Sequence, residues 1–101
     1  MYERKCHLCG RNGMRDPLET HHVFRGKNRA LSEAFHATVL LCGNSCHRNG
    51  KNSVHKNPTV NLQLEQEFQK KIMEEYEMDM KDWIFVFGRN YLDMEEDAYV
   101  E

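Results

Sequence analysis

Hydrophobic positions recur every four residues in the second half of the chain. Leu64, Phe68, Ile72 and Tyr76 have this spacing, which predicts a long helix after Pro58 with these side chains along one stripe. Between Leu64 and Tyr76 most of the other positions are charged, namely Glu65, Glu67, Lys70, Lys71, Glu74 and Glu75. We therefore expect the stripe to be core that packs over the first half of the chain, and we assign it no chemistry.

A shorter helix is predicted to follow the long one. Asp79 fits an N-cap, and Asp82 fits the acidic third position of a capping box. Gly88 is expected to end this helix, because glycine commonly occupies the residue after a helix. Its predicted buried face consists of Trp83, Ile84 and Phe87.

Shorter patterns fill the first half, which is rich in Gly, Asn, Arg, His and Cys. Residues 20–24 and 38–41 are rich in β-prone side chains and predict two short strands. Apolar residues at helical spacing predict a short helix within 28–36. Another short helix is expected to carry the last cysteine and to end near Asn49-Gly50.

The length of 101 residues is enough for one domain. We expect residues 1–57 to form the core, residues 58–92 to form a helical extension packed on it, and the mostly acidic residues 93–101 to be disordered. The fold class is therefore α+β. A core of this size is modest, and small folds often add a disulfide or a metal as a staple.

Charge is distributed unevenly, although the net charge is only −2. Residues 1–57 contain ten Lys and Arg against four Asp and Glu, whereas residues 58–101 contain four against twelve. The basic half also holds every cysteine and every histidine. This distribution is compatible with a site for a polyanion such as nucleic acid, but a lopsided solvated surface would look the same.

The start of the chain resembles neither a secretory signal nor a membrane anchor. Tyr2, Glu3, Arg4 and Lys5 follow Met1 directly, and no apolar run is long enough to cross a bilayer. We therefore expect a cytoplasmic protein with no membrane partner. Cysteines stay reduced in that compartment and are available to metal.

The four cysteines form two closely spaced pairs. Two residues separate Cys6 from Cys9, and three separate Cys42 from Cys46, so each pair can point two thiolates at one ion. Together the pairs supply the four ligands of a tetrahedral structural zinc. Two disulfides or four free thiols are alternatives, and a neighbouring histidine, His7 or His47, could replace one thiolate.

Two adjacent histidines, His21 and His22, lie between the cysteine pairs. Neighbouring side chains on a regular strand point to opposite faces, so both cannot approach one metal unless the strand twists or bulges. They can still have different roles, one binding an ion and the other reaching a water molecule. Alone, such a pair is weak evidence, since surface histidines are common.

The ordered combination of these motifs resembles the HNH endonuclease superfamily, also called ββα-metal or His-Me finger nucleases. The motifs are Cys6-x2-Cys9, Glu19-Thr20-His21-His22-Val23-Phe24 and Leu40-Leu41-Cys42-x3-Cys46-His47. Three further segments resemble small HNH proteins of phages and prophages, namely residues 21–33, Val54-His55 and residues 87–92. The resemblance implies a ββα-metal core, DNA as substrate, and a phage or prophage protein as a further partner.

The resemblance also implies a role for each histidine. His21 would bind the catalytic metal, His22 would be the general base, and His47 would complete the metal site. His55 is expected to be a further ligand or a phosphate contact. The resemblance further implies a one-metal, in-line hydrolysis that leaves 5′-phosphate and 3′-hydroxyl ends.

This sequence departs from the family at one position. The family's middle asparagine usually lies about five residues before the third zinc cysteine, where this chain has Ala37 and Thr38. Asn28 or Asn44 could supply the orienting hydrogen bond instead, and Asn28 is the residue that we assign to this role.

Phosphodiester hydrolysis is a reaction that histidine and a bound divalent ion can catalyse. Histidine exchanges protons near neutral pH, and a divalent ion stabilises the negative charge of the phosphate and the leaving oxygen. We expect magnesium or manganese, although imidazole ligands also accept nickel, cobalt or zinc. Basic residues that are close to the site histidines in the sequence could bind the phosphates of the nucleic-acid backbone. They are Arg25, Lys27, Arg29, Arg48, Lys51 and Lys56.

Two functions without cleavage compete with the nuclease. One is a zinc-stabilised module that binds DNA or protein, and the other is a structural zinc domain in a phage assembly. Neither needs a base beside a metal ligand, and a purely structural zinc domain should bind one metal per chain.

Overall fold

Two short strands form the sheet of this protein. The computed structural model describes residues 4–93, in which β1 (Leu18–His22) pairs antiparallel with β2 (Thr38–Cys42). His22 lies opposite Thr38, and Leu18 lies opposite Cys42. Both predicted strands are confirmed, but β1 begins and ends two residues earlier than expected. Val23 and Phe24 follow the strand as fully buried core residues.

A short helical segment connects the two strands. It consists of the 3-10 turn η1 (Gly26–Asn28) and helix α1 (Arg29–Ala34), which confirms the helix predicted within residues 28–36. The buried hydroxyl of Ser32 donates to Phe24 O at 2.7 Å and accepts from Phe24 N at 2.8 Å. These two bonds fix α1 against the end of β1.

Helix η2 (Gly43–Arg48) leaves β2 directly. It has π-helical geometry and carries both Cys46 and His47, as the sequence predicted for a short helix at this place. The N–H groups of Asn49 and Gly50 both donate to Asn44 O, at 2.9 Å and 3.0 Å, and this ends the helix where expected.

Side-chain caps begin both C-terminal helices, and the cap of the second was predicted. In α2 (Pro58–Glu75), the Asn57 side chain accepts from two backbone N–H groups of the first turn. In α3 (Met80–Phe87), Asp79 and Asp82 form the expected capping box. Gly88 ends α3 with φ of 86°, a left-handed conformation that favours glycine. The 3-10 turn η3 (Tyr91–Asp93) follows.

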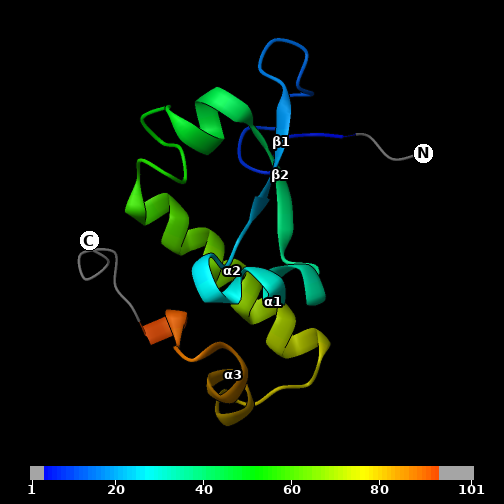
Figure 1. Cartoon of the computed structure of the whole chain (residues 1–101), viewed down its shortest axis with the longest axis vertical. Coiled ribbons are helices and arrows are strands. Elements are labelled where there is room, and N and C mark those ends of the chain that lie inside the picture. Colours follow the sequence, from blue (N-terminus) through cyan, green and yellow to red (C-terminus); the bar gives the residue numbers. More distant parts are fainter. Residues whose placement is uncertain (1–3, 94–101) are drawn as a thin grey trace.

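The core joins the two halves of the chain. The Phe24 ring lies 5.6 Å from Trp83, 5.0 Å from Phe87 and 5.3 Å from Tyr91, measured between ring centroids. The stripe on α2 is buried as predicted at Leu64, Phe68 and Ile72. Helices α1, α2 and α3 therefore pack together at one end of the sheet, whereas η2 lies at the other end (Figure 1).

Three predicted burial assignments are wrong. Tyr76 is 43% exposed, because α2 ends one residue before it, and its ring packs edge-on against Phe35. Ile84 is 39% exposed, because Trp83 and Phe87, four residues apart, make the buried face of α3. Glu65 is buried instead of solvated, and its Oε1 accepts a hydrogen bond from the Asn61 amide at 3.3 Å.

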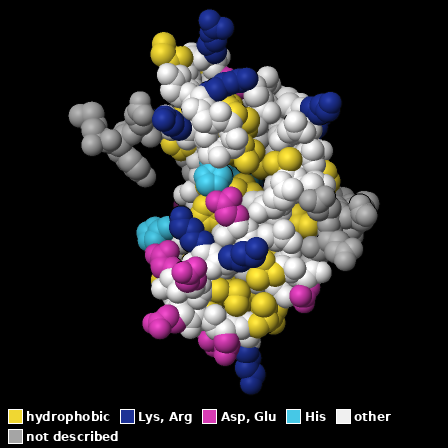
Figure 2. Space-filling view, turned by 180° about the vertical axis from the view of Figure 1, so that it is seen from behind, with side chains coloured by type: hydrophobic (Ala, Val, Ile, Leu, Met, Phe, Trp, Pro, Cys, Tyr) yellow, Lys and Arg dark blue, Asp and Glu magenta, His cyan; other side chains and the backbone are white. Residues whose placement is uncertain are grey.

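Charge is divided between the ends of the molecule. Most acidic side chains on one face lie in its lower half, where some Lys and Arg side chains also occur, whereas the charged side chains at the upper end are mainly Lys and Arg (Figure 2). Within residues 4–93, no helix is both long and apolar enough to span a bilayer. Most of the predicted acidic tail lies outside the described residues, but Asp93 belongs to η3.

Candidate metal centres

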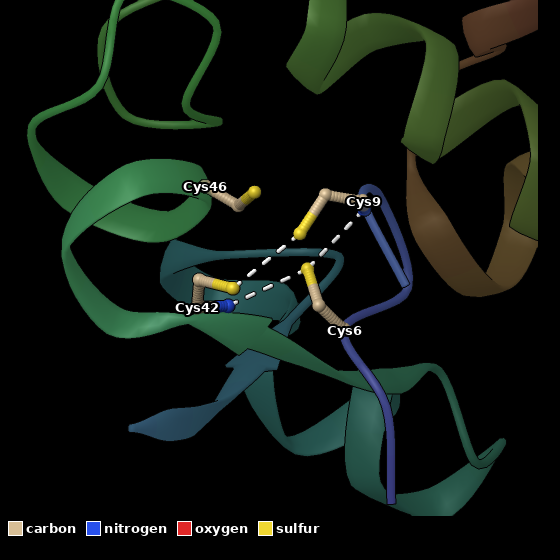
Figure 3. A group of neighbouring side chains, drawn as sticks. All are labelled: Cys6, Cys9, Cys42 and Cys46. Atoms are coloured by element: carbon tan, nitrogen blue, oxygen red, sulfur yellow. Dashed lines mark hydrogen bonds between the residues drawn. The ribbon is translucent and has the colours of Figure 1, made fainter. Parts of the chain in front are cut away.

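The four cysteines converge from three parts of the chain. Cys6 and Cys9 come from the N-terminal turn, Cys42 ends β2, and Cys46 lies in η2. Their four Sγ atoms lie within 4.8 Å of one another and point toward a common centre (Figure 3). The predicted cysteine cluster is thus confirmed as a group that could hold zinc.

Sulfur distances distinguish a metal site from disulfides. Cys9 Sγ lies 3.5 Å from Cys42 Sγ, and all four thiols are free. A disulfide needs an S–S distance of about 2.05 Å. Tetrahedral zinc with Zn–S bonds of about 2.3 Å separates its sulfurs by about 3.8 Å, close to the observed spacing.

The pKa values of the clustered thiols are also consistent with a bound cation. Burial raises the pKa of Cys6, but backbone N–H donors from Cys9, Cys42 and Leu8 outweigh it and lower the pKa to about 6. For Cys42, burial followed by the neighbouring thiols raises the pKa to about 12. The Cys6 thiolate is therefore stabilised by the backbone, whereas Cys42 needs a positive ion to ionise beside it.

Neither neighbouring histidine takes a place in the cysteine cluster. His7 Nε2 lies 3.0 Å from Glu67 Oε2, and its ring packs against Phe68. His47 belongs to a second cluster, which consists of histidines. The alternative in which His7 or His47 replaces one of the four thiolates is therefore not seen in the structure.

Three histidines form this second group of potential ligands. His21 lies on β1, His47 on η2, and His55 in the loop before α2, and one ring nitrogen of each lies within 4.8 Å of the others. The loop is attached to η2 by Val54 N–H to Cys46 O at 2.9 Å and His55 N–H to His47 O at 3.2 Å. These bonds place His55 beside His47, with ring centroids 4.8 Å apart.

His21 is the most deeply buried member of this cluster. Only 2% of it is exposed, and its Nε2 has no hydrogen-bond partner among the described residues. Burial, followed by the nearby His47 and His55, lowers the pKa of His21 to about 3. The ring is therefore neutral at physiological pH, with a buried nitrogen that a metal ion would satisfy.

Glu19 orients His47, a contact that the sequence did not reveal. Glu19 Oε1 lies 2.8 Å from His47 Nδ1, and Oε2 accepts from Arg48 at 2.8 Å. Gly43 makes room for this carboxylate, since a Cβ there would lie 2.9 Å from the Glu19 carboxyl carbon. A carboxylate on Nδ1 holds the tautomer whose Nε2 is available to a metal.

A cavity of about 330 Å³ opens over the histidine cluster. His22 lines it together with the three clustered histidines, although His22 itself is not one of them. Its Nε2 lies 3.5 Å from Glu33 Oε1. The full lining is Thr20, His21, His22, Arg25, Gly26, Arg29, His47 and His55. Successive side chains of a strand point to opposite faces. His21 therefore lies within the group of potential ligands, whereas His22 lines the cavity outside that group.

The predicted phosphate-binding residues have different surroundings. Arg25 and Arg29 line the cavity, and an Arg25 guanidinium nitrogen lies 2.9 Å from His55 Nδ1. Burial, then Arg25 and His47, lower the pKa of His55. Arg48 is engaged by Glu19 and by Gly43 O. The other basic candidates, Lys27, Lys51 and Lys56, are exposed outside the lining.

Asn28, assigned to orient the base, lies elsewhere. Its side-chain amide donates to Phe87 O at 2.9 Å, and Asn28 is buried there with 8% exposure. This bond ties the turn before α1 to the end of α3. Asn28 does not line the cavity.

Comparison of the chain with models of known protein families, with curated proteins and with solved structures finds no match. Function is therefore inferred from the geometry of the two clusters.

Proposed function

We propose that this protein is a metal-dependent endonuclease of the HNH type that hydrolyses phosphodiester bonds of DNA. His22 is the general base, and one divalent ion binds His21, His47 and His55. The observation that carries the proposal is the buried His21 Nε2, which has no hydrogen-bond partner within residues 4–93 and lies among two other histidines in a cavity that a fourth histidine lines.

In this proposal the chain's own residues position the substrate and move the proton. Arg25 and Arg29 bind a backbone phosphate at the cavity, and their positive charge attracts the polyanion. His22 accepts a proton from the attacking water, and Glu33 stabilises the ring after it has gained charge. When bound, the divalent ion supplies charge stabilisation of the phosphate and of the leaving 3′ oxygen.

The donor set changes our expectation of the ion. The sequence favoured magnesium or manganese, with two histidine ligands. Three clustered imidazoles form a nitrogen donor set, which suits manganese, cobalt, nickel or zinc better than magnesium, an ion that prefers oxygen ligands. We therefore expect activity with a transition metal to exceed that with magnesium.

A zinc-stabilised binding module is the second candidate. Position 37, where the family usually has its asparagine, is a fully buried alanine, and this favours a domain that has lost cleavage. Such a module would keep the cysteine cluster and would not need His22.

Plasmid cleavage distinguishes the two candidates. We expect the zinc-loaded protein with added manganese or cobalt to nick or linearise plasmid, and His22→Ala to be slower by about 10²–10⁴-fold, the usual contribution of a general base. His36→Asn is the matched control, because His36 is exposed, does not line the cavity, and has φ of 59°, which asparagine tolerates. If neither unmodified protein nor control cuts DNA with any of these ions, the binding module takes the place of the nuclease.

A further inference from the structure

A cationic loop projects from the end of the sheet opposite α3. Residues 10–16, the arginine loop, connect the first cysteine pair to β1 and form the upper end of the molecule in Figure 1. The loop contains Arg11 and Arg15, both exposed, and Met14, which is 84% exposed. With Lys5 it borders a hollow of about 790 Å³ that is open to solvent. Lys and Arg side chains gather at this end in Figure 2.

The single acidic residue of this loop is used to attach it. Asp16 accepts from Asn44 N and from Ser45 N, one bond on each carboxylate oxygen and both at 2.8 Å. Gly43 N also donates to Pro17 O at 2.9 Å. The acceptor atoms of Asp16 are therefore directed at the start of η2, and the loop presents arginine charge to solvent.

The attachment also fixes the loop relative to the histidine cluster. Helix η2, which receives these bonds, is the helix that carries His47. Gly13 shapes the turn, with φ of 86° and Leu18 Cγ 2.8 Å from where a Cβ would lie. Met14 follows this turn, and its N–H donates to Asn12 Oδ1 at 3.0 Å. An exposed apolar side chain is thus held between two arginines by an ordered turn.

The separation from the cavity suits one duplex. The arginine loop precedes β1, whereas His21 and His22 end it, and a five-residue strand is about 17 Å long at about 3.3–3.4 Å per residue. One turn of duplex DNA spans about 34–36 Å. A duplex of fewer than two turns is therefore longer than the strand that separates the loop from the cavity.

We propose that the arginine loop is a second contact for duplex DNA, in which Arg11 and Arg15 bind backbone phosphates and Met14 enters the adjacent groove. Arginine pairs with phosphate through two parallel N–H donors, and methionine is among the apolar side chains that enter DNA grooves as wedges. The inference rests on the proposed nuclease function and adds a contact remote from the cavity, which would hold the substrate in register with His22.

Binding to a fluorescein-labelled duplex of about 20 base pairs tests this contact. The titration follows fluorescence anisotropy at several salt concentrations, in the zinc-loaded His22→Ala background so that the duplex stays intact. We expect Arg11→Ala with Arg15→Ala to weaken binding about ten-fold or more and to reduce the slope of log K against log salt by about two, since each phosphate contact contributes about 0.9. Met14→Ala should weaken binding without changing the slope, and Met14→Leu should restore it.

Matched variants keep the result interpretable. Lys70→Ala with Lys81→Ala removes the same charge from exposed positions on α2 and α3, and should leave the slope unchanged. Arg11→Lys with Arg15→Lys keeps the charge and should retain most of the slope. Circular dichroism and one zinc per chain confirm that each variant is folded.

The outcomes separate this proposal from the nuclease. If the double arginine variant binds with unchanged affinity and slope while the unmodified protein cuts plasmid, the loop has another partner, such as an acidic protein, and this inference is overturned alone. If the slope falls as expected but no ion supports cleavage, the DNA contact stands and the nuclease fails. Absence of any duplex binding overturns both.

Discussion

His21 and His22 show how adjacent residues of the same type acquire different surroundings. His21 faces the interior, where its buried nitrogen joins two other imidazoles, whereas His22 lines the cavity beside Glu33. The spacing of the cysteines and the histidine pair could be interpreted from the sequence because each motif is local. The role of Glu19 could not, since its contact with His47 spans 28 residues. Nothing local predicts that pairing.

Glu19 should control metal affinity at the histidine cluster. Glu19→Gln removes the charge that fixes His47 through Nδ1, so we expect cobalt or nickel to bind about 10–100-fold more weakly, as for other partners of metal-bound histidines. Isothermal titration of the ion into zinc-loaded protein measures this. Glu67→Gln is the control, because Glu67 pairs with His7 at a similar distance outside the cluster. Equal affinities in both variants would show that Glu19 has no such role.

The buried His21 should make stability depend on pH. Its pKa is about 3 in the folded protein against 6.5 ordinarily, so between these values the unfolded chain binds the extra proton. Folding stability is therefore greatest above pH 6.5 and falls as the pH decreases toward 3. From about pH 7.5 to about pH 5, we expect this group to remove up to about 2 kcal/mol, at about 1.4 kcal/mol per pH unit.

Urea unfolding of the zinc-loaded protein without a second ion measures this loss. His21→Gln keeps the cysteine cluster but lacks the titrating ring, so its stability should change less over the same range. His36→Asn, which removes an exposed histidine, should behave as the unmodified protein. An identical pH dependence in the unmodified protein and His21→Gln would refute the effect of burial.

At the scale of elements, periodicity and caps predicted more than burial did. The Asp79–Asp82 box begins α3 as expected, because caps are local hydrogen-bonding patterns, whereas the Asn57 cap of α2 was not predicted. Burial depends on how neighbouring elements pack, and this is why Tyr76, at the end of α2, and Ile84, beside the buried face of α3, were misassigned. The π geometry of η2 was also not predicted; its six residues carry ligand candidates for both clusters.

Substitution of Asn28 tests whether this predicted site residue has a structural role instead. Its amide donates to Phe87 O while it is buried, so Asn28→Ala should lower the free energy of unfolding by about 1–2 kcal/mol through the unsatisfied carbonyl. The rate of plasmid cleavage by the folded fraction should not change, because Asn28 lies outside the cavity lining. A large loss of cleavage rate with unchanged stability would instead support the orienting role expected from the sequence.

At the scale of the whole molecule, η2 connects three features. It contributes Cys46 to the cysteine cluster and His47 to the histidine cluster, and its first residues hold Asp16 of the arginine loop. An ion held by the cysteines would therefore fix the helix that positions the proposed site. Helices α2 and α3 complete the core around Phe24 and bring acidic charge to the far end. The sequence predicted this division of charge but not its spatial arrangement.

The number of metal ions per chain, measured with cleavage in the same samples, tests the proposed pair of metal centres most directly. After dialysis against cobalt or manganese, we expect elemental analysis to find two ions in the unmodified protein, and one zinc in His21→Ala with His47→Ala. Only the two-ion protein should cut plasmid. One ion in the unmodified protein, or equal cleavage by the double variant, would contradict a catalytic metal at the histidine cluster.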